Sequence, residues 1–273
     1  MSIHIKMKTP NNKIINRIVE EKIPCVFVSP HLDDAILSAG DLIAYLSKRT
    51  TVEVVNVFTK PSPRPYTLSA RSFLRQCGYK DADKLFQDRT REDIKVFSAL
   101  GIKPHYLDFV DSTWRKIQNI GFIRRVLGKI IPELNHIYPV HRLHIINGRV
   151  SSKDKAMTVQ LSRKLETITS KYKKFYVFCP LAINSHVDHT VVRNVCTKTF
   201  KNNLIFWSDF PYNVQRKIDK QEIDKMKLKL FLWRDNIIRK KKLISGYKSQ
   251  FRTLFPNNYV PLISEIYYVG FNK

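Results

Sequence analysis

The stretch CVFVSPHLDDAILSAG, residues 25–40, decides the fold of this 273-residue chain. Cys25 to Ser29 is a short, largely apolar run, which predicts a buried strand. A turn at Pro30 to Asp34 follows, and apolar residues then recur at helical spacing. The apolar face of this expected helix consists of Ala35, Ile36, Ala39, Leu42, Ile43 and Leu46. A buried strand that leads through a tight turn into a helix is the opening of a βαβ unit.

The same alternation of apolar runs and amphipathic segments continues along the chain. Strands are expected at 52–58, 105–109, 143–146, 175–181 and 204–207, and helices at 90–100, 122–136, 155–172 and 190–200. Residues 60–88 begin with several prolines and predict an irregular excursion with one short helix. The pattern predicts the α/β class, with a Rossmann-like, mostly parallel sheet flanked by helices.

The C-terminal part of the chain has a different character. Residues 225–245 are Lys-rich and amphipathic, and 265–270 has extended character. We expect one domain over 1–273, with a core at about 24–212 and a basic, helical C-terminal extension at about 213–273.

Composition indicates a folded, strongly cationic protein. The chain has 48 Lys and Arg against 23 Asp and Glu, a formal net charge of +25, and 43% hydrophobic residues. No apolar run approaches the roughly 18 residues of a membrane span, and no signal peptide is recognisable, so a cytoplasmic location is expected. The four cysteines are widely spaced and predict buried apolar side chains, not disulfides or a thiolate zinc site.

Three kinds of partner fit the positive charge. Residues 216–242 hold 11 Lys and Arg against 4 Asp and Glu, which suits nucleic acid, an anionic membrane or a phosphate-bearing substrate. No helix-turn-helix, zinc-finger, RRM or KH signature accompanies this charge, and a solvated Lys-rich helix face also explains it. A basic nucleic-acid-binding or peripheral membrane-binding protein with a non-catalytic metal site is therefore the alternative function.

The turn after the first strand carries the strongest chemical signal. Ligands of open α/β sheets bind at the carboxyl ends of the strands, which is where this turn lies. His31 and Asp34 can point at one ion, while Asp33 stays free to take a proton. The alternative is that Asp33 and Asp34 only cap the following helix and favour its positive N-terminus.

A second polar cluster follows the apolar run at 175–178. His186, Asp188 and His189 form an H-x-D-H pattern before another expected helix. Loop histidines of this kind are often merely solvated. Together, however, the two clusters supply two His and one Asp to a divalent metal and leave positions open for water and substrate, as a catalytic site requires.

With these two motifs the chain resembles the LmbE/PIG-L family of metal-dependent N-deacetylases. The family signature is an H-P-D-D turn with a distal H-x-x-H, which appear here as H-L-D-D and H-V-D-H, so Leu32 replaces the usual proline. The run SPHLDDAILS at 29–38 matches a bacterial subgroup. Further matching stretches occur in order, and the resemblance covers roughly 24–255. The further matching stretches are Arg89-x-x-Glu92-Asp93, Leu107 to Asp111, Asp209 to Tyr212 and Tyr247 to Gln250.

The resemblance implies a function and a set of roles. The reaction would remove an N-acetyl group from an amino sugar or its conjugate by means of a metal-activated water. His31, Asp34 and His189 would bind the metal, usually Zn²⁺, with Fe²⁺ as the alternative. Asp33 would be the general base, and His186 would stabilise the oxyanion or protonate the leaving amine.

The resemblance also implies supporting residues and partners. Asp188 would orient His186, and Arg89 and Asp111 would bind the substrate, although Arg89 could instead pair with Glu92 or Asp93 on a helix surface. The substrate could be phosphate-bearing or lipid-linked, and the basic face could attach the protein to the inner face of a membrane. Trp114 is either a sugar-stacking platform or a core aromatic. We expect the remaining histidines to be structural: His105, His136, His141 and His144.

Overall fold

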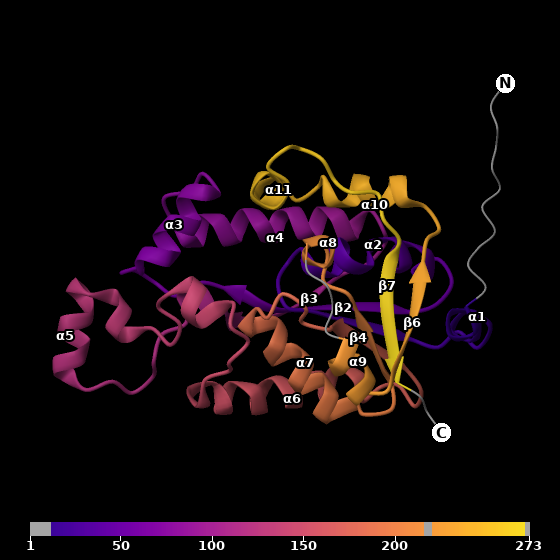
Figure 1. Ribbon diagram of the computed structural model, residues 1–273, viewed down its shortest axis with the longest axis horizontal. Coiled ribbons are helices and arrows are strands. Elements are labelled where there is room, and N and C mark those ends of the chain that lie inside the picture. The colour runs from indigo at the N-terminus through magenta and orange to yellow at the C-terminus, as the bar shows by residue number, and fades with distance from the viewer. Residues whose placement is uncertain (1–11, 216–219, 271–273) are drawn as a thin grey trace.

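A single seven-stranded sheet runs through the residues that the computed structural model describes, 12–215 and 220–270 (Figure 1). Its strand order is β3-β2-β1-β4-β5-β7-β6. The strands are β1 (Cys25–Ser29), β2 (Val52–Lys60), β3 (His105–Val110), β4 (Tyr176–Pro180), β5 (Leu204–Trp207), β6 (Leu228–Trp233) and β7 (Glu265–Gly270).

The first five strands form a parallel sheet, and the direction in which strands are added reverses at β1. β3, β2, β1, β4 and β5 are parallel neighbours, and β7 and β6 add to β5 in antiparallel fashion. The chain moves outward from β1 through β2 to β3, and then returns to place β4 on the other side of β1. The carboxyl ends of β1 and β4 therefore flank the point at which a ligand crevice is expected.

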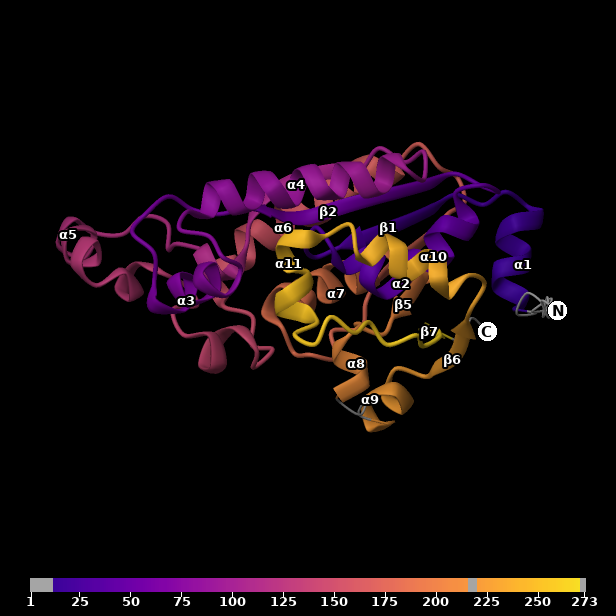
Figure 2. The ribbon, with the colours of Figure 1, turned by 90° about the horizontal axis from the view of Figure 1, so that it is seen from above.

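Helices cover both faces of the sheet, as Figures 1 and 2 show. The helices are α1 (Lys13–Glu20), α2 (Asp34–Leu46), α3 (Leu68–Gln76), α4 (Ala82–Ser98), α5 (Phe122–Ile130), α6 (Lys155–Thr169), α7 (Val187–Phe200), α8 (Tyr212–Gln215), α9 (Lys220–Lys225), α10 (Ile237–Ile244) and α11 (Lys248–Leu254). One core lies between the sheet and α1, α2, α4 and α10, and a second lies between the sheet and α6 and α7. The predicted fold class is confirmed.

The cores explain why the elements lie where they do. Every residue of β1 is buried, and the ring of Phe27 stacks on Phe178 of the neighbouring β4 at a centroid distance of 4.4 Å. Cys25 belongs to the first core, and Cys179 and Cys196 belong to the second, as expected, whereas Cys77 is only half-buried. None of the helices in the described residues has the length and apolar character needed to cross a bilayer.

Several segments of the first 200 residues differ from expectation, including α1, where no helix is expected, and the helix expected at 122–136, which ends at Ile130. The excursion at 60–88 contains all of α3 and the start of α4, because Thr67 and Asp81 cap these helices by accepting hydrogen bonds from Ala70 and Lys84. The strand predicted at 143–146 is wrong, since a short π-helix, η3 (His141–Ile145), occupies this segment. A short apolar run is compatible with a strand or with a helix. Here the packing of Ile145 in a small apolar cluster favours the helix.

The predicted helical character of the C-terminal extension is also partly wrong. β6 lies within the segment expected to be helical and pairs with β7, which pairs with β5. Burial along LKLFLW alternates from Leu230 onward: Leu230 and Leu232 are exposed, Phe231 is partly buried and Trp233 is buried. The part of the basic segment at 216–219 lies outside the described residues.

Candidate active site

The turns after β1 and β4 meet at one cavity of about 400 Å³. His31, Asp33 and Asp34 come from the β1–α2 turn, and His186, Asp188 and His189 from the start of α7. Of the eight site residues predicted from the sequence, seven line this cavity, and Asp188 does not. Two clusters that are about 150 residues apart in the chain therefore share one site, as parallel strands with a switch between them permit.

The β1–α2 turn is held by its own hydrogen bonds. The Ser29 hydroxyl donates to the carbonyl of His31 (2.6 Å) and accepts from the amide of Ala35 (3.0 Å). The Asp34 carboxylate accepts from the amide of His31 (2.8 Å). Asp33 makes no capping hydrogen bond, so its carboxylate is available to the cavity.

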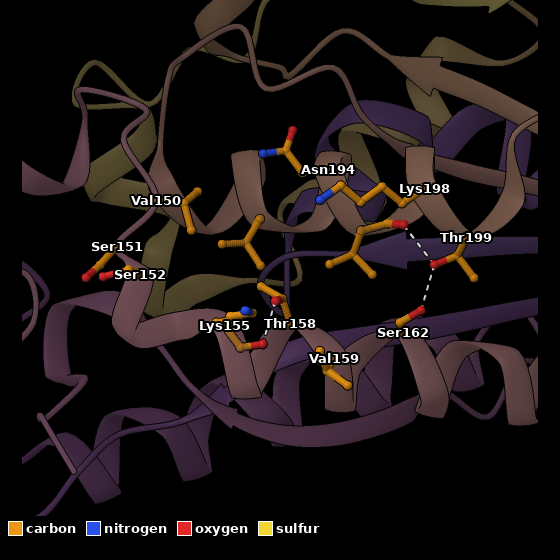
Figure 3. A pocket seen from close by; sticks show the side chains of 12 residues that line it. Val150, Ser151, Ser152, Lys155, Thr158, Val159, Ser162, Asn194, Lys198 and Thr199 are labelled. Atoms are coloured by element: carbon orange, nitrogen blue, oxygen red, sulfur yellow. Dashed lines mark hydrogen bonds between the residues drawn. The ribbon is translucent and has the colours of Figure 1, made fainter. Parts of the chain in front are cut away.

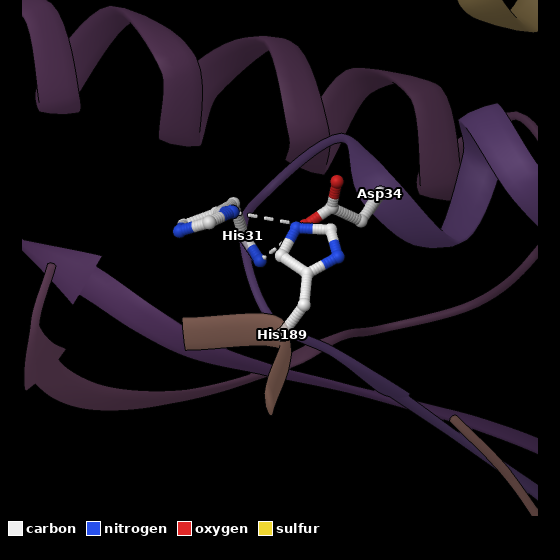
Figure 4. Close-up of side chains that lie close together, drawn as sticks. All are labelled: His31, Asp34 and His189. Atoms are coloured by element: carbon white, nitrogen blue, oxygen red, sulfur yellow. Dashed lines mark hydrogen bonds and ion pairs between the residues drawn. The ribbon is translucent and has the colours of Figure 1, made fainter. Parts of the chain in front are cut away.

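Two imidazoles converge on one oxygen of Asp34, as Figure 4 shows. Oδ2 of Asp34 lies 3.0 Å from Nδ1 of His31 and 3.2 Å from Nε2 of His189. These three residues each offer one ligand atom, and the three atoms lie within 4.8 Å of one another. The set contains two nitrogens and one oxygen, which are donors that Zn²⁺ and Fe²⁺ both accept.

The remaining ring nitrogens show that this set fits a cation. Nε2 of His31 faces the Asp188 carboxylate at 3.2 Å, and Nδ1 of His189 faces the Asp209 carboxylate at 2.6 Å. A neutral imidazole has one N–H. If that hydrogen is donated to Asp188 or Asp209, the other nitrogen of each ring presents a lone pair to Asp34. The Asp34 carboxylate and the two ring lone pairs then face one point, where a divalent cation can bind. The Asp188 and Asp209 carboxylates fix the tautomers of the two histidines.

The electrostatics agree with this geometry. Burial alone would lower the pKa of His189, but the Asp34 and Asp209 carboxylates raise it to about 9. Burial likewise opposes the charge on His31, yet the Asp188 and Asp34 carboxylates hold its pKa well above the ordinary value.

Asp33 is paired with a buried arginine. NH2 of Arg89 donates to Oδ1 of Asp33 at 3.2 Å, and both side chains are almost fully buried. Glu92 instead accepts from the backbone of Ser249, and Asp93 from the hydroxyl of Tyr106. Burial raises the pKa of Asp33 against the opposing effect of the Arg89 guanidinium.

His186 and Asp188 lie beside the three candidate metal ligands, but their side chains do not contact each other. Nδ1 of His186 accepts from the backbone amide of Asp188 (3.3 Å) and so caps α7. The Asp188 carboxylate contacts Nε2 of His31, the backbone amide of Ser112 (2.9 Å) and the guanidinium of Arg115. Burial and the nearby His31 hold the pKa of His186 well below its ordinary value.

Asp111 also lies against the three candidate metal ligands. Its Oδ1 accepts from the amide of Thr113 (2.8 Å), and its Oδ2 is 3.5 Å from Nε2 of His31. Burial raises the pKa of the Asp111 carboxyl, against the opposing effect of His31. Trp114, close by in sequence, is fully buried in the cluster between α3 and α4 and is a core aromatic.

Sequence reasoning missed three residues of the site. Asp209 holds His189 and was part of the family resemblance without a role, although it follows the end of β5 and so could have been considered. Arg115 binds Asp188 and also Asp154 (2.8 Å), and no local pattern signals it. His141, expected to be structural, lines the cavity.

Another cavity, of about 590 Å³, lies between α6 and α7 (Figure 3). Its walls carry Ser, Thr, Lys, Asn and Val side chains, and the Ser162 and Thr199 hydroxyls are hydrogen-bonded across it at 2.9 Å. No His, Asp, Glu or Cys lines it. The candidate metal-binding and acid–base side chains line the smaller cavity at the strand ends.

Comparisons with known proteins show to which family the chain belongs. The family model described as PIG-L, GlcNAc-PI de-N-acetylase, matches residues 26–200. A 2'-N-acetylparomamine deacetylase from Niallia circulans is 26% identical over 213 residues, covering 71% of this chain and 69% of that protein.

Solved structures with the same fold include two deacetylases. A deacetylase of the teicoplanin pathway superposes with a TM-score of 0.71 at 19% identity, covering 90% of this chain and 96% of that one. A deacetylase of the A40926 pseudoaglycone gives 0.63 at 19% identity, covering 91% and 97%. At these identities the likeness concerns the fold.

Proposed function

This chain belongs to the PIG-L family of GlcNAc-PI de-N-acetylases, and on that premise we propose that it is a zinc-dependent N-deacetylase. Its reaction is the hydrolysis of the acetamide of an N-acetylated amino sugar or amino-sugar conjugate. The observation that carries the proposal is the convergence of His31, His189 and Asp34 beside the buried Asp33, in a cavity at the carboxyl ends of β1 and β4.

His31, Asp34 and His189 would hold the metal. A divalent cation there supplies Lewis acidity, which polarises an amide carbonyl and lets water lose a proton near pH 7. Zn²⁺ suits the two imidazoles and one carboxylate, and Fe²⁺ is the alternative that the same donors accept.

Asp33 is proposed as the general base. It lines the cavity beside the three ligands, so it can take the proton of the attacking water. The raised pKa of its carboxyl makes it a stronger base than an exposed aspartate. Arg89 fixes the carboxylate through the hydrogen bond to Oδ1 and leaves Oδ2 for the water.

His186 is proposed to donate to the oxygen of the reacting amide. Its pKa is low, so the ring is neutral, and Nδ1 accepts from the Asp188 amide, so the ring hydrogen is on Nε2. A neutral N–H donor stabilises developing negative charge on oxygen. This geometry favours the oxyanion role over protonation of the leaving amine.

The supporting roles follow from the same contacts. Asp188 is proposed as a positioning residue that acts on His31 rather than on the His186 ring, because its carboxylate faces Nε2 of His31. Arg89 and Asp111 line the cavity and are proposed to bind sugar hydroxyls. Asp111 accepts such hydrogen bonds, and Arg89 donates them.

The basic charge is proposed to favour phosphate-bearing or lipid-linked substrates and attachment to the inner, cytoplasmic face of a membrane. Part of this charge is already neutralised, since Lys240 pairs with Glu265 at 2.9 Å and Arg239 with Asp41 at 3.0 Å. The nucleic-acid alternative is not favoured, because it leaves the buried catalytic cluster and the family match unexplained.

The test is metal content together with acetate release by the purified full chain. We expect about one divalent metal per chain, and acetate release from N-acetylglucosamine conjugates and N-acetylated aminoglycosides. Asp33→Asn should keep the metal and lose about 10²- to 10⁴-fold in turnover. The control is Asp83→Asn, a change in the first turn of α4.

Three outcomes would count against the assignment. A chain that binds no divalent metal, or an Asp33→Asn variant that releases acetate as fast as the parent, would overturn it. Loss of metal in Asp33→Asn would mean that Asp33 is a ligand and not the base.

A further inference from the structure

Helix α5 turns its apolar side away from the protein. At about 100° per residue, its apolar residues fall on one arc of about 140°, and its basic residues fall on the opposite arc. The apolar arc consists of Phe122, Ile123, Val126, Leu127 and Ile130, with exposed fractions of 77%, 75%, 42%, 47% and 79%. A surface helix of a globular protein normally buries this arc against the core.

The polar side of α5 contacts the protein instead. Nε of Arg124 donates to the carbonyl of Leu134 at 2.8 Å, within the 3₁₀ turn η2 (Pro132–Asn135) that follows α5. Gly128 is the only buried residue of the helix, and a Cβ there would collide with the Asn135 side chain. The helix is therefore fixed in the orientation that exposes its apolar arc.

Neighbouring segments extend this apolar surface. Leu68, Ile131, Leu134, Val140 and Leu143 are also exposed. We call α5 together with these five residues the α5 surface; α5 lies at one end of the molecule in both ribbon views (Figures 1 and 2). Exposed apolar patches of this kind mark interaction sites.

The charge around the α5 surface is almost entirely positive. Residues 116–149 contain six Lys and Arg and a single acid, Glu133. That acid is occupied, because its carboxylate accepts from the amide of Leu68 at 2.8 Å. Phe, Ile and Leu on one side of a helix, with Arg and Lys on the other, are the pattern of helices that lie in the interface of an anionic bilayer.

The α5 surface adjoins the mouth of the active-site cavity. Glu133 joins η2 to the start of α3, and the Ser69 hydroxyl accepts from the amide of His141 at 3.1 Å. Ser69 and His141 both line the active-site cavity. A surface in contact with α5 would therefore lie next to the cavity entrance.

We propose that the α5 surface docks the protein on an anionic lipid bilayer, with the apolar arc of α5 among the acyl chains and its arginines and lysine at the headgroups. Each buried apolar side chain adds binding energy, and the basic side chains add attraction to the anionic lipids. This docking surface differs from the basic segment at 216–242, and it does not depend on the deacetylation chemistry.

The test is sedimentation of the full chain with vesicles at low salt. We expect the protein to pellet with phosphatidylcholine–phosphatidylglycerol vesicles, less with phosphatidylcholine alone, and less as salt rises. The double change Ile123→Asp and Ile130→Asp should weaken partitioning by about tenfold or more. The matched control is Leu230→Asp with Ile238→Asp, two residues that are 54% and 65% exposed in the basic C-terminal region.

A fluorescence measurement gives an independent result. The native tryptophans, Trp114, Trp207 and Trp233, are all buried, so Phe122→Trp adds an exposed reporter. Its emission should shift to shorter wavelength on anionic vesicles. The Ile123→Asp, Ile130→Asp variant should release acetate from a water-soluble N-acetyl sugar at the parent rate, which keeps docking and chemistry separate.

Several results would overturn the proposal. They are a parent protein that does not pellet with vesicles, an α5 variant that pellets as well as the parent, or a control variant whose partitioning falls as much as that of the α5 variant. A parent that self-associates in sedimentation velocity, becomes monomeric in the α5 variant and ignores vesicles would identify a second copy of the chain as the occupant.

Discussion

The two turns that build the candidate active site are held in different ways. The backbone of the β1–α2 turn is held by contacts within residues 29–35: the Ser29 hydroxyl accepts from the amide of Ala35, and the Asp34 carboxylate accepts from the amide of His31. The start of α7 depends on side chains from elsewhere. Arg115 and the Ser112 amide hold Asp188, and Asp209 holds both His189 and the amide of Ile183 (2.9 Å).

The difference separates what is encoded locally from what the tertiary structure supplies. The backbone of the first turn is fixed within a short stretch of sequence, although Asp188 and Arg89 also contact the side chains of His31 and Asp33. The second turn needs partners that arrive from the ends of β3 and β5. Changes remote in sequence should therefore damage the second turn, while changes in the first turn should have local effects.

The largest effect is expected for Arg115→Met. This change leaves the Asp188 and Asp154 carboxylates buried without their shared cation, which should lower the free energy of unfolding by about 3–5 kcal/mol. Urea unfolding of the metal-free protein measures it. Arg115→Lys should recover part of the loss, because it restores the charge but not the fork of donors.

The control is Arg91→Met, which removes a largely exposed arginine paired with Asp88 and should change stability by less than about 1 kcal/mol. Equal losses in the two methionine variants would mean that the second turn does not depend on its distant partner, and the contrast between the turns would fail.

The same difference explains what could be predicted from the sequence. The strand-turn-helix at 25–46 carries its apolar period and its site residues in one stretch, so both fold class and His31, Asp33 and Asp34 could be predicted. Arg115 and Asp209 act across the fold, and nothing in their local pattern reveals the partner. β6 was misjudged as helix because pairing with β7, not its local Lys-rich composition, decides its structure.

A smaller effect is expected for Asp209→Asn. The amide can still accept from Ile183 but loses the charge that orients His189, so zinc affinity should fall by about 10- to 100-fold. Competition against a chromophoric chelator measures it. Asp108→Asn, at a half-exposed carboxylate paired with Lys60, is the control and should leave affinity unchanged. Unchanged affinity in Asp209→Asn would show that His189 needs no outer partner.

Zinc affinity should also rise with pH. The carboxylates around His31 and His189 raise the pKa of both rings, to about 9 for His189, so protons occupy them at neutral pH and compete with the metal. Affinity should increase about tenfold per pH unit for each proton displaced, and the contribution of His189 should level off above about pH 9. In Asp209→Asn the pKa of His189 falls, so the rise should be less steep. An affinity that is constant from pH 6 to 9 would contradict this prediction.

The smallest effect is expected for Ser29→Ala. Loss of the hydroxyl leaves the His31 carbonyl and the Ala35 amide without this partner in a fully buried turn, which should cost about 1–2 kcal/mol of unfolding free energy. Zinc affinity should stay within about threefold, because the Asp34 carboxylate still holds the amide of His31. Ser47→Ala, at the less buried end of α2, is the control and should have almost no effect on stability. A loss of zinc affinity in Ser29→Ala as large as that in Asp209→Asn would mean that both turns depend equally on single hydrogen bonds, whatever their distance in sequence.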